Sequence, residues 1–125
     1  FGSFGTNDLT QYVMASDRLD SRLSDMTSTW HPAVLRAIAI ASQAAAEVVK
    51  PIGVCGEAAA NPHLAAVLLG LGVNSLSMAP SAISEVRGLL STVDLALCQA
   101  AAQRAVSASS AEESERLARE ILEQN

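Results

Sequence analysis

Three short apolar stretches typical of β-strands are each followed by a helical pattern, and this alternation constrains the fold more than any other feature. The strand patterns begin at Phe1, Ile52 and Ser75. Strands that alternate with helices predict parallel strands joined by right-handed crossovers. A closed barrel needs about eight strands, so the first and third strands here should each have an unpaired edge. We therefore expect the chain to associate with a second copy as a homodimer.

Helix start signals divide the rest of the chain. They occur at Pro32 after Thr29 or His31, at Pro62 after Asn61, at Pro80 or Ser81, at Ser91 with Asp94, and at Ser110 with Glu113. The expected helices cover 33–49, 63–69, 80–90, 91–106 and the residues after Ser110. We expect residues 57–60 to form a loop. The chain is predicted to be a single partial domain, with three βα units over 1–90 and a C-terminal helical tail over 91–125.

Composition and charge exclude several classes of protein. Half of the residues are hydrophobic and alanine is abundant, which predicts a globular, helix-rich α/β chain. The net charge of −5 argues against a nucleic-acid or anionic-membrane surface. No apolar run reaches the roughly 18 residues of a membrane span. With two cysteines there is no disulfide scaffold, which favours the cytoplasm, and a start at Phe1 instead of Met suggests a piece of a longer protein.

The most unusual chemistry lies in residues 3–12, SFGTNDLTQY, and in Arg18 a short distance after them. Asn7 and Asp8 stand where the first strand should pass into a loop, and the carboxyl ends of parallel strands form the ligand-binding face of α/β folds. Asp8 suits a hard cation, Asn7 a phosphate or carboxylate oxygen, and Arg18 a bidentate contact with the same anion. An alternative stays open here: Asn and Asp after Gly also form Asx turns and helix N-caps, and a nearby Arg is often only solvated.

The cysteines and histidines differ in what their surroundings indicate. Cys55 lies between two glycines at the end of the second strand, a position that favours a chemical role over that of a buried structural thiol. Cys98 lies on the apolar side of a predicted helix and should pack in the core. His31 and His63 both neighbour a helix-start proline and lack partners at metal-ligand spacing, so we expect them to be structural or exposed.

These motifs match a known family. The chain resembles the C-terminal phosphoenolpyruvate-binding domain of phosphoenolpyruvate-utilising enzymes. Within that family it is most similar to enzyme I of the bacterial sugar phosphotransferase system, the phosphoenolpyruvate–protein phosphotransferase. The resemblance covers essentially the whole chain and rests on SFGTNDLTQY at 3–12 with Arg18, HPAVL at 31–35, GVCGE at 53–57, LLGLG at 68–72 and LSM at 76–78.

The resemblance implies a (β/α)₈ TIM-type barrel, of which this chain would form the last three βα units plus the C-terminal helices. It implies that Asp8 ligates an essential Mg²⁺ and that Asn7 and Arg18 hold the phosphate of phosphoenolpyruvate. Cys55 is implied to protonate the methylene carbon as the enol becomes pyruvate. Phosphoryl transfer depends mainly on positioning and charge neutralisation, which a cation and an Arg supply. The implied partners are phosphoenolpyruvate and a phosphocarrier protein, the latter reached through an N-terminal domain outside this chain.

Two other interpretations stay open. Pyruvate phosphate dikinase and phosphoenolpyruvate synthase share the Asn-Asp and Cys-Gly-Glu motifs, although Tyr12 and residues 15–18 favour enzyme I. The chain can also be a non-catalytic association module. We expect it to be inactive on its own, because the family's second magnesium carboxylate and its other phosphate-binding arginines lie on earlier strands.

Overall fold

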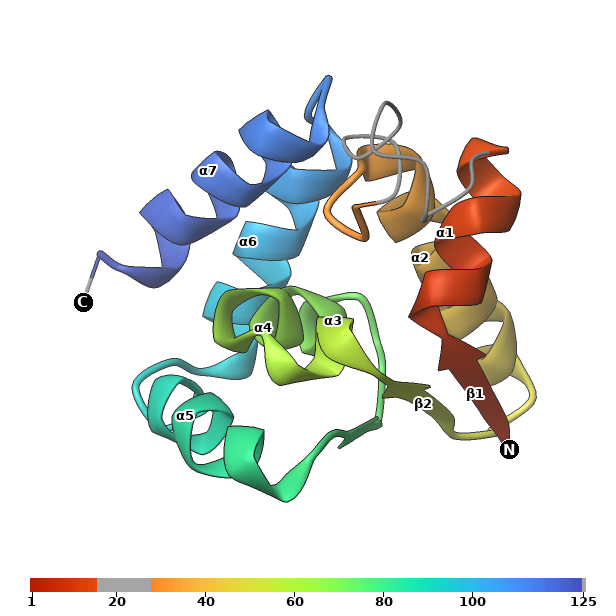
Figure 1. The fold of residues 1–125 in the computed structure, drawn as a ribbon, viewed down its shortest axis with the longest axis horizontal. Helices are drawn as coiled ribbons and strands as arrows, with labels where there is room; N and C mark the ends of the chain where they lie inside the picture. Colours follow the sequence, from red (N-terminus) through yellow and green to blue (C-terminus); the bar gives the residue numbers. More distant parts are fainter. Residues whose placement is uncertain (16–27, 125) are drawn as a thin grey trace.

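The computed structural model describes residues 1–15 and 28–124. A short parallel sheet and a larger set of helices make up these residues (Figure 1). The strands are β1 (Gly2–Gly5), β2 (Ile52–Cys55) and β3 (Ser75–Ser77), and the helices are α1 (Thr6–Met14), α2 (Pro32–Glu47), α3 (Glu57–Ala60), α4 (Pro62–Gly70), α5 (Pro80–Leu90), α6 (Leu95–Val106) and α7 (Ala111–Leu122). None of these helices is both long and apolar enough to span a bilayer.

The strands form one parallel sheet in the order β1–β2–β3, as the alternation predicts. Gly5 pairs with Cys55, and Cys55 pairs with Ser77, so the carboxyl ends of the strands lie at one edge. Side chains alternate between the two faces of a strand. Phe4 and Val54, which are lateral partners, therefore point together into the hydrophobic core.

The opposite face of the sheet carries only small side chains. Its residues are Ser3, Gly5, Gly53, Cys55, Ser75 and Ser77. All of them are exposed except Gly53, which is half-buried. Within the described residues, the sheet thus has one face packed in the core and one face open.

The core lies between the packed face of the sheet and the helices around α4. Helix α4 contacts α3, α5, α6 and α7, and α6 contacts α2 and α7. The largest fully buried apolar side chains are Val34, Leu35, Ile38, Val54, Val67 and Leu68. They come from α2, β2 and α4, so the middle units of the chain supply most of the core.

Local capping signals predicted most helix starts correctly. His31, Asn61 and Ser110 each accept a hydrogen bond from a backbone N–H in the first turn of α2, α4 and α7. The fold is helix-rich α/β with a small parallel sheet. A barrel that contains this sheet stays a prediction.

Two expectations about local structure were wrong. Residues 57–60 form the short helix α3 instead of a loop, since Ala58 and Ala59 favour helix and are buried against the core. Ser91 does not start a helix, because its hydroxyl donates to the carbonyl oxygen of Gly88 at the end of α5. Asp94 is the N-cap of α6 instead.

Two glycines inside helices test how closely α4 packs against α6. A Cβ on Gly70 would overlap the backbone of Cys98, whereas a Cβ on Gly88 would meet no atom within 4 Å. We predict that Gly70→Ala lowers the free energy of unfolding by about 1–3 kcal/mol, because the helices must move apart. The matched control Gly88→Ala should raise it by about 0.5–1 kcal/mol through helix propensity. Urea unfolding followed by circular dichroism measures both changes, and equal effects would contradict the close α4–α6 contact.

Candidate functional site at the carboxyl edge of the sheet

Three of the predicted site residues, Asn7, Asp8 and Cys55, lie at the carboxyl edge of the sheet. Strand β1 ends at Gly5 and α1 begins at the next residue, while β2 ends at Cys55. Because Gly5 and Cys55 are partners in the β1–β2 register, the first turn of α1 lies beside the cysteine. The structure thus brings together two segments that are far apart in the sequence.

The loop expected after the first strand is not observed, because α1 begins at Thr6 with Gly5 as its N-cap. Asn7 and Asp8 lie in the first turn of α1, and no side chain caps this helix. The alternative of an Asn or Asp cap is therefore wrong. Helices α2, α4, α6 and α7, by contrast, are each capped by a side chain. The first N–H groups of α1 are left for an anion, which a helix N-terminus attracts.

The side chains of Asp8 and Cys55 lie on the same face of the sheet. Carboxylate oxygen Oδ2 of Asp8 lies 3.8 Å from the point where a Cβ on Gly5 would stand. A side chain on Gly5 would point to the same face as that of its lateral partner Cys55. Asp8 and Cys55 are both exposed. One ligand on this face could therefore contact both the Asp8 carboxylate and the Cys55 thiol.

Main-chain contacts hold Cys55 at the start of α1. Its thiol donates a hydrogen bond to the carbonyl oxygen of Phe4 with an Sγ–O distance of 3.4 Å. The hydroxyl of Thr6 lies 3.5 Å from the backbone carbonyl oxygen of Cys55. Gly56, with a φ of 106°, turns the chain sharply out of β2, a conformation that favours glycine. The thiol therefore sits at an open but well-anchored strand end.

Sequence reasoning missed the threonines that anchor α1. Thr6 and Thr10 are each 1% exposed. The Thr10 hydroxyl donates to the carbonyl oxygen of Thr6 at 2.7 Å and lies 3.4 Å from the hydroxyl of Thr29, shortly before α2. These contacts fix the helix that carries Asn7 and Asp8. The available signal was the four-residue spacing of Thr6 and Thr10, which places them on one face of a helix.

Asp8 also borders a hollow on the surface of α1. The described residues that line it are Asp8, Gln11 and Tyr12, and its volume is about 450 Å³. Within 1–15 and 28–124, no three His, Cys, Asp or Glu side chains come together as a metal site. Mg²⁺ sites often combine one or two carboxylates with water and phosphate oxygens. Asp8, an exposed carboxylate, therefore suits one ligand position of such a site.

The remaining candidates have clear positions, except Arg18, which lies outside the described residues. Cys98 is 3% exposed and packs in the core, as predicted. His31 has a structural role as the N-cap of α2.

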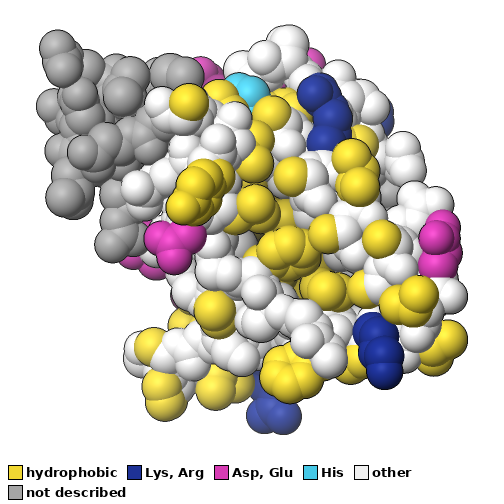
Figure 2. All heavy atoms as spheres, turned by 90° about the vertical axis from the view of Figure 1, so that its right-hand side faces the viewer, with side chains coloured by type: hydrophobic (Ala, Val, Ile, Leu, Met, Phe, Trp, Pro, Cys, Tyr) yellow, Lys and Arg dark blue, Asp and Glu magenta, His cyan; other side chains and the backbone are white. Residues whose placement is uncertain are grey.

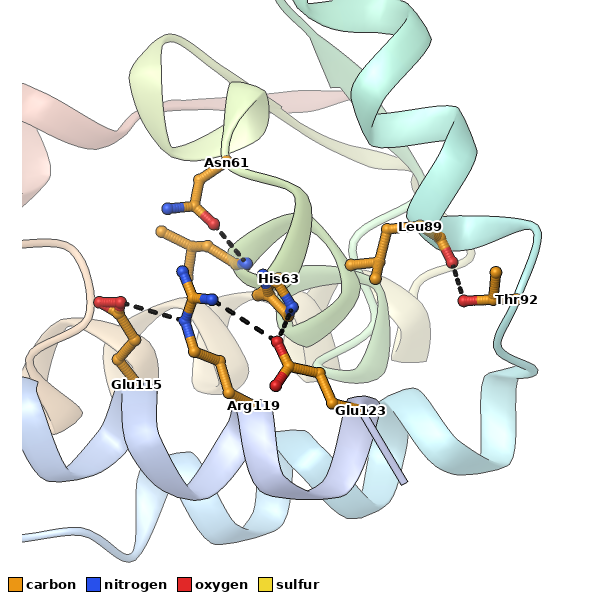
Figure 3. A network of polar contacts seen from close by, with 8 residues as sticks. Asn61, His63, Leu89, Thr92, Glu115, Arg119 and Glu123 are labelled. Carbon is orange, nitrogen blue, oxygen red and sulfur yellow. Dashed lines mark hydrogen bonds and ion pairs between the residues drawn. The ribbon is translucent and has the colours of Figure 1, made fainter. Parts of the chain in front are cut away.

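His63 also has a structural role, because it joins α4 to the end of α7 (Figure 3). Its Nε2 atom lies 2.9 Å from Oε1 of Glu123. Arg119 lies between Glu115 and Glu123, with nitrogen–oxygen distances of 3.4 and 3.6 Å. Figure 3 shows these side chains bridging the two helices. None of these contacts involves Cys55, and the His63–Glu123 contact helps to hold α7 against α4.

The two cysteines should differ in reactivity. Cys55 is exposed and Cys98 is buried. We predict that iodoacetamide modifies Cys55 alone in the folded protein and both cysteines in urea, because only unfolding exposes the second thiol. Mass spectrometry of peptides after timed quenching measures this. Equal rates in native buffer would contradict the packing of Cys98 between α4 and α6.

Stability should also depend on the Cys98 proton at alkaline pH. Burial, and to a lesser degree the Asp94 carboxylate, raise the pKa of the Cys98 thiol above its ordinary value. The unfolded chain then releases this proton at lower pH than the folded chain, so stability should fall as pH rises through the ordinary thiol range. Urea unfolding across that range measures the effect. Its slope should be shallower in Cys98→Ala, and an unchanged slope would contradict this assignment.

Comparison with known proteins identifies the family. Residues 1–95 match the family described as PEP-utilising enzyme, PEP-binding domain, where PEP is phosphoenolpyruvate. The phosphoenolpyruvate-protein phosphotransferase of Streptomyces coelicolor is 48% identical over 122 residues, which are 98% of this chain and 22% of that protein. The phosphoenolpyruvate-dependent phosphotransferase system protein of Salmonella typhimurium is 40% identical over 90% of this chain and 15% of its own length. The multiphosphoryl transfer protein of Xanthomonas campestris pv. campestris is 42% identical over 90% of this chain and 14% of its own length.

The chain spans 22% or less of the length of these relatives. The family match runs from β1 to the first residue of α6, so it includes the whole sheet and its carboxyl edge. Asn7, Asp8 and Cys55 all lie within it. The chain therefore belongs to the family of phosphoenolpyruvate-utilising enzymes, in which it matches the phosphoenolpyruvate-binding domain.

Proposed function

We propose that this chain forms part of the phosphoenolpyruvate and Mg²⁺ site of a phosphoenolpyruvate–protein phosphotransferase, enzyme I of the bacterial sugar phosphotransferase system. The observation that carries the proposal is the pairing of Gly5 with Cys55. This pairing sets an uncapped helix N-terminus, with Asn7 and Asp8, beside an exposed thiol. Relatives of that name with identities of 48% and 38% support it.

In this proposal Asn7 and Arg18 hold the phosphate of the substrate. Asn7 is supported by its place in the first turn of α1, where N–H groups and the positive end of the helix dipole favour an anion. Arg18 is assigned from the family resemblance alone. The family uses a metal cofactor, and we assign Asp8 as one ligand of Mg²⁺. Bound there, Mg²⁺ would neutralise charge on the phosphoryl group.

Cys55 is the proton donor in the proposed reaction. The bond from phosphorus to the enol oxygen breaks as phosphorus bonds to a histidine nitrogen elsewhere in the parent enzyme, and the enolate of pyruvate is left. The thiol of Cys55 then gives its proton to the methylene carbon, which becomes the methyl group of pyruvate. The resulting thiolate regains a proton from water. Its contact with Phe4 supports this role, because it anchors the sulfur at the open edge of the sheet.

We assign the sheet to the last three βα units of a (β/α)₈ barrel, with α6 and α7 as the C-terminal helices. The open face of small residues would then line the barrel interior. Figure 2 shows many hydrophobic and few charged side chains on the side of the molecule formed by α1, β1 and α2. The large exposed apolar residues in these elements and directly beside them are Phe1, Tyr12, Ile40, Val48 and Val49. A preceding βα unit would cover this side, and in its absence a homodimer would do so.

The proposed phosphocarrier partner and cytoplasmic location follow from the assignment of the parent protein to enzyme I. The phosphoryl group would pass from the enzyme's histidine to a phosphocarrier protein, in the cytoplasm, through a domain that precedes this one. We propose that this chain alone does not phosphorylate a carrier, because in the family that it resembles the second magnesium carboxylate and the other phosphate-binding arginines lie on earlier strands. A nucleotide-binding domain upstream in the gene product would indicate pyruvate phosphate dikinase or phosphoenolpyruvate synthase instead.

Calorimetry tests the proposed site. We predict that millimolar phosphoenolpyruvate binds the chain and that Mg²⁺ strengthens binding. Asp8→Asn should remove the strengthening by Mg²⁺, because the carboxylate ligand is lost. Asn7→Ala should weaken binding about tenfold with or without Mg²⁺, since a hydrogen bond to a charged group is worth about 1.5–3 kcal/mol.

The control is Asp94→Asn, which removes a carboxylate elsewhere and keeps an N-cap for α6. Its binding should equal that of the unchanged protein. No heat at millimolar ligand would favour the non-catalytic association module. Binding that Asn7→Ala and Asp8→Asn leave unchanged would place the ligand elsewhere.

A further inference from the structure

A small cavity lies at the opposite end of β2 from Cys55. Its volume is about 330 Å³, within the range of ligand pockets. It is formed where α2 ends, where β2 begins and where the chain turns from α4 into β3. The lining residues are Ser42, Ala46, Val49, Lys50, Pro51, Gly72 and Asn74.

Two lining residues bring hydrogen-bond donors to this cavity, and a third carries a buried hydroxyl. Lys50 is the only lysine in the sequence. Oδ1 of Asn74 accepts a hydrogen bond from the backbone N–H of Ile52 at 2.8 Å, which orients the amide and leaves its NH₂ group to donate. Ser42 is 3% exposed, and its hydroxyl has no hydrogen-bond partner in the described part of the chain. A buried hydroxyl without a partner is uncommon and indicates a missing one.

The backbone at the cavity is strained. Val49 has a φ of 54°, in the left-handed region that β-branched residues avoid. Its N–H donates to the carbonyl oxygen of Ala46 and the N–H of Lys50 donates to that of Ala45, a helix ending that usually uses glycine. The Val49 side chain is 88% exposed, so packing does not compensate for the strain. Strain of this kind concentrates at functional sites.

The helix ends at the cavity do not exclude an anion. Two helices end there, and free carbonyl groups at a helix C-terminus would repel an anion. At the end of α2, however, the carbonyls of Ala45 and Ala46 accept bonds from the turn. At the end of α4, the carbonyls of 67–69 accept bonds from the N–H groups of 71–73. The carboxylate of Glu47 is not among the lining groups, so among the described residues Lys50 carries the only charged side chain that lines the cavity.

We infer that this cavity binds a small organic monocarboxylate. Lys50 and Asn74 take the carboxylate, and Ala46, Val49 and Pro51 contact the apolar part. This site is separate from the proposed phosphoenolpyruvate site, because β2 runs from one to the other, and it does not depend on that function.

Butyrate is the probe, and backbone and side-chain amide shifts in ¹H–¹⁵N NMR spectra are the measurement. Titration should shift the amides of Val49, Lys50 and Gly72 and the side-chain NH₂ of Asn74. Butyramide, which has the same shape and no charge, should shift them at least about tenfold more weakly. Shifts confined to Asn7, Asp8 and Cys55, or equal shifts with butyramide, would overturn the inference. Neither outcome would affect the phosphoenolpyruvate proposal.

Substitutions locate the donors. Lys50→Gln should weaken butyrate binding about tenfold, and its matched control Arg104→Gln, an exposed cation on α6, should not change it. Asn74→Asp keeps the acceptor for the N–H of Ile52 but replaces the NH₂ donor by a negative charge, so it should abolish binding. Butyrate affinity unaltered by Lys50→Gln and Asn74→Asp, in variants whose spectra show the native fold, would overturn the inference.

Discussion

The pairing of β1 with β2 is the interaction on which the site depends. It joins the first residues of the chain to a strand from its middle, and its register places Gly5 against Cys55. The contacts at the site follow from that register: the Cys55 thiol reaches the Phe4 carbonyl, and the Thr6 hydroxyl approaches the Cys55 carbonyl. A shift by one residue would turn the thiol to the packed face of the sheet.

The two faces of the sheet differ in burial and in side-chain size. Phe4 and Val54 bury one face in the core with the helices. The other face has only Gly, Ser and Cys side chains, which contribute little hydrophobic burial. The stability of the described residues therefore comes mainly from the helical side, and the open face is left for chemistry or for other strands.

The two ends of the strands differ in the groups that they offer to a ligand. At the carboxyl end the chain enters α1 without a side-chain cap, which leaves N–H donors beside Asp8 and Cys55. At the amino end the carbonyls of Ala45 and Ala46 and of residues 67–69 accept hydrogen bonds from the turns that follow, and Lys50 supplies the positive charge. One strand, β2, thus connects two places where we propose that anions bind, through backbone N–H groups at one and through a side-chain cation at the other.

The sequence by itself determined the order of the elements apart from α1 and α3, most of the helix starts and the position of Cys55 at a strand end, because those signals are local. Prolines after His31 and Asn61 fix where α2 and α4 begin whatever packs around them. The sequence predicted a loop at Asn7 and Asp8, with an Asx turn or an N-cap left open, and it predicted Ser91 instead of Asp94 as the start of α6, since local hydrogen bonding permits these alternatives. Tertiary structure decided those choices. It also made the threonine contacts of α1 and the cavity at Lys50, because both need residues that only folding brings together.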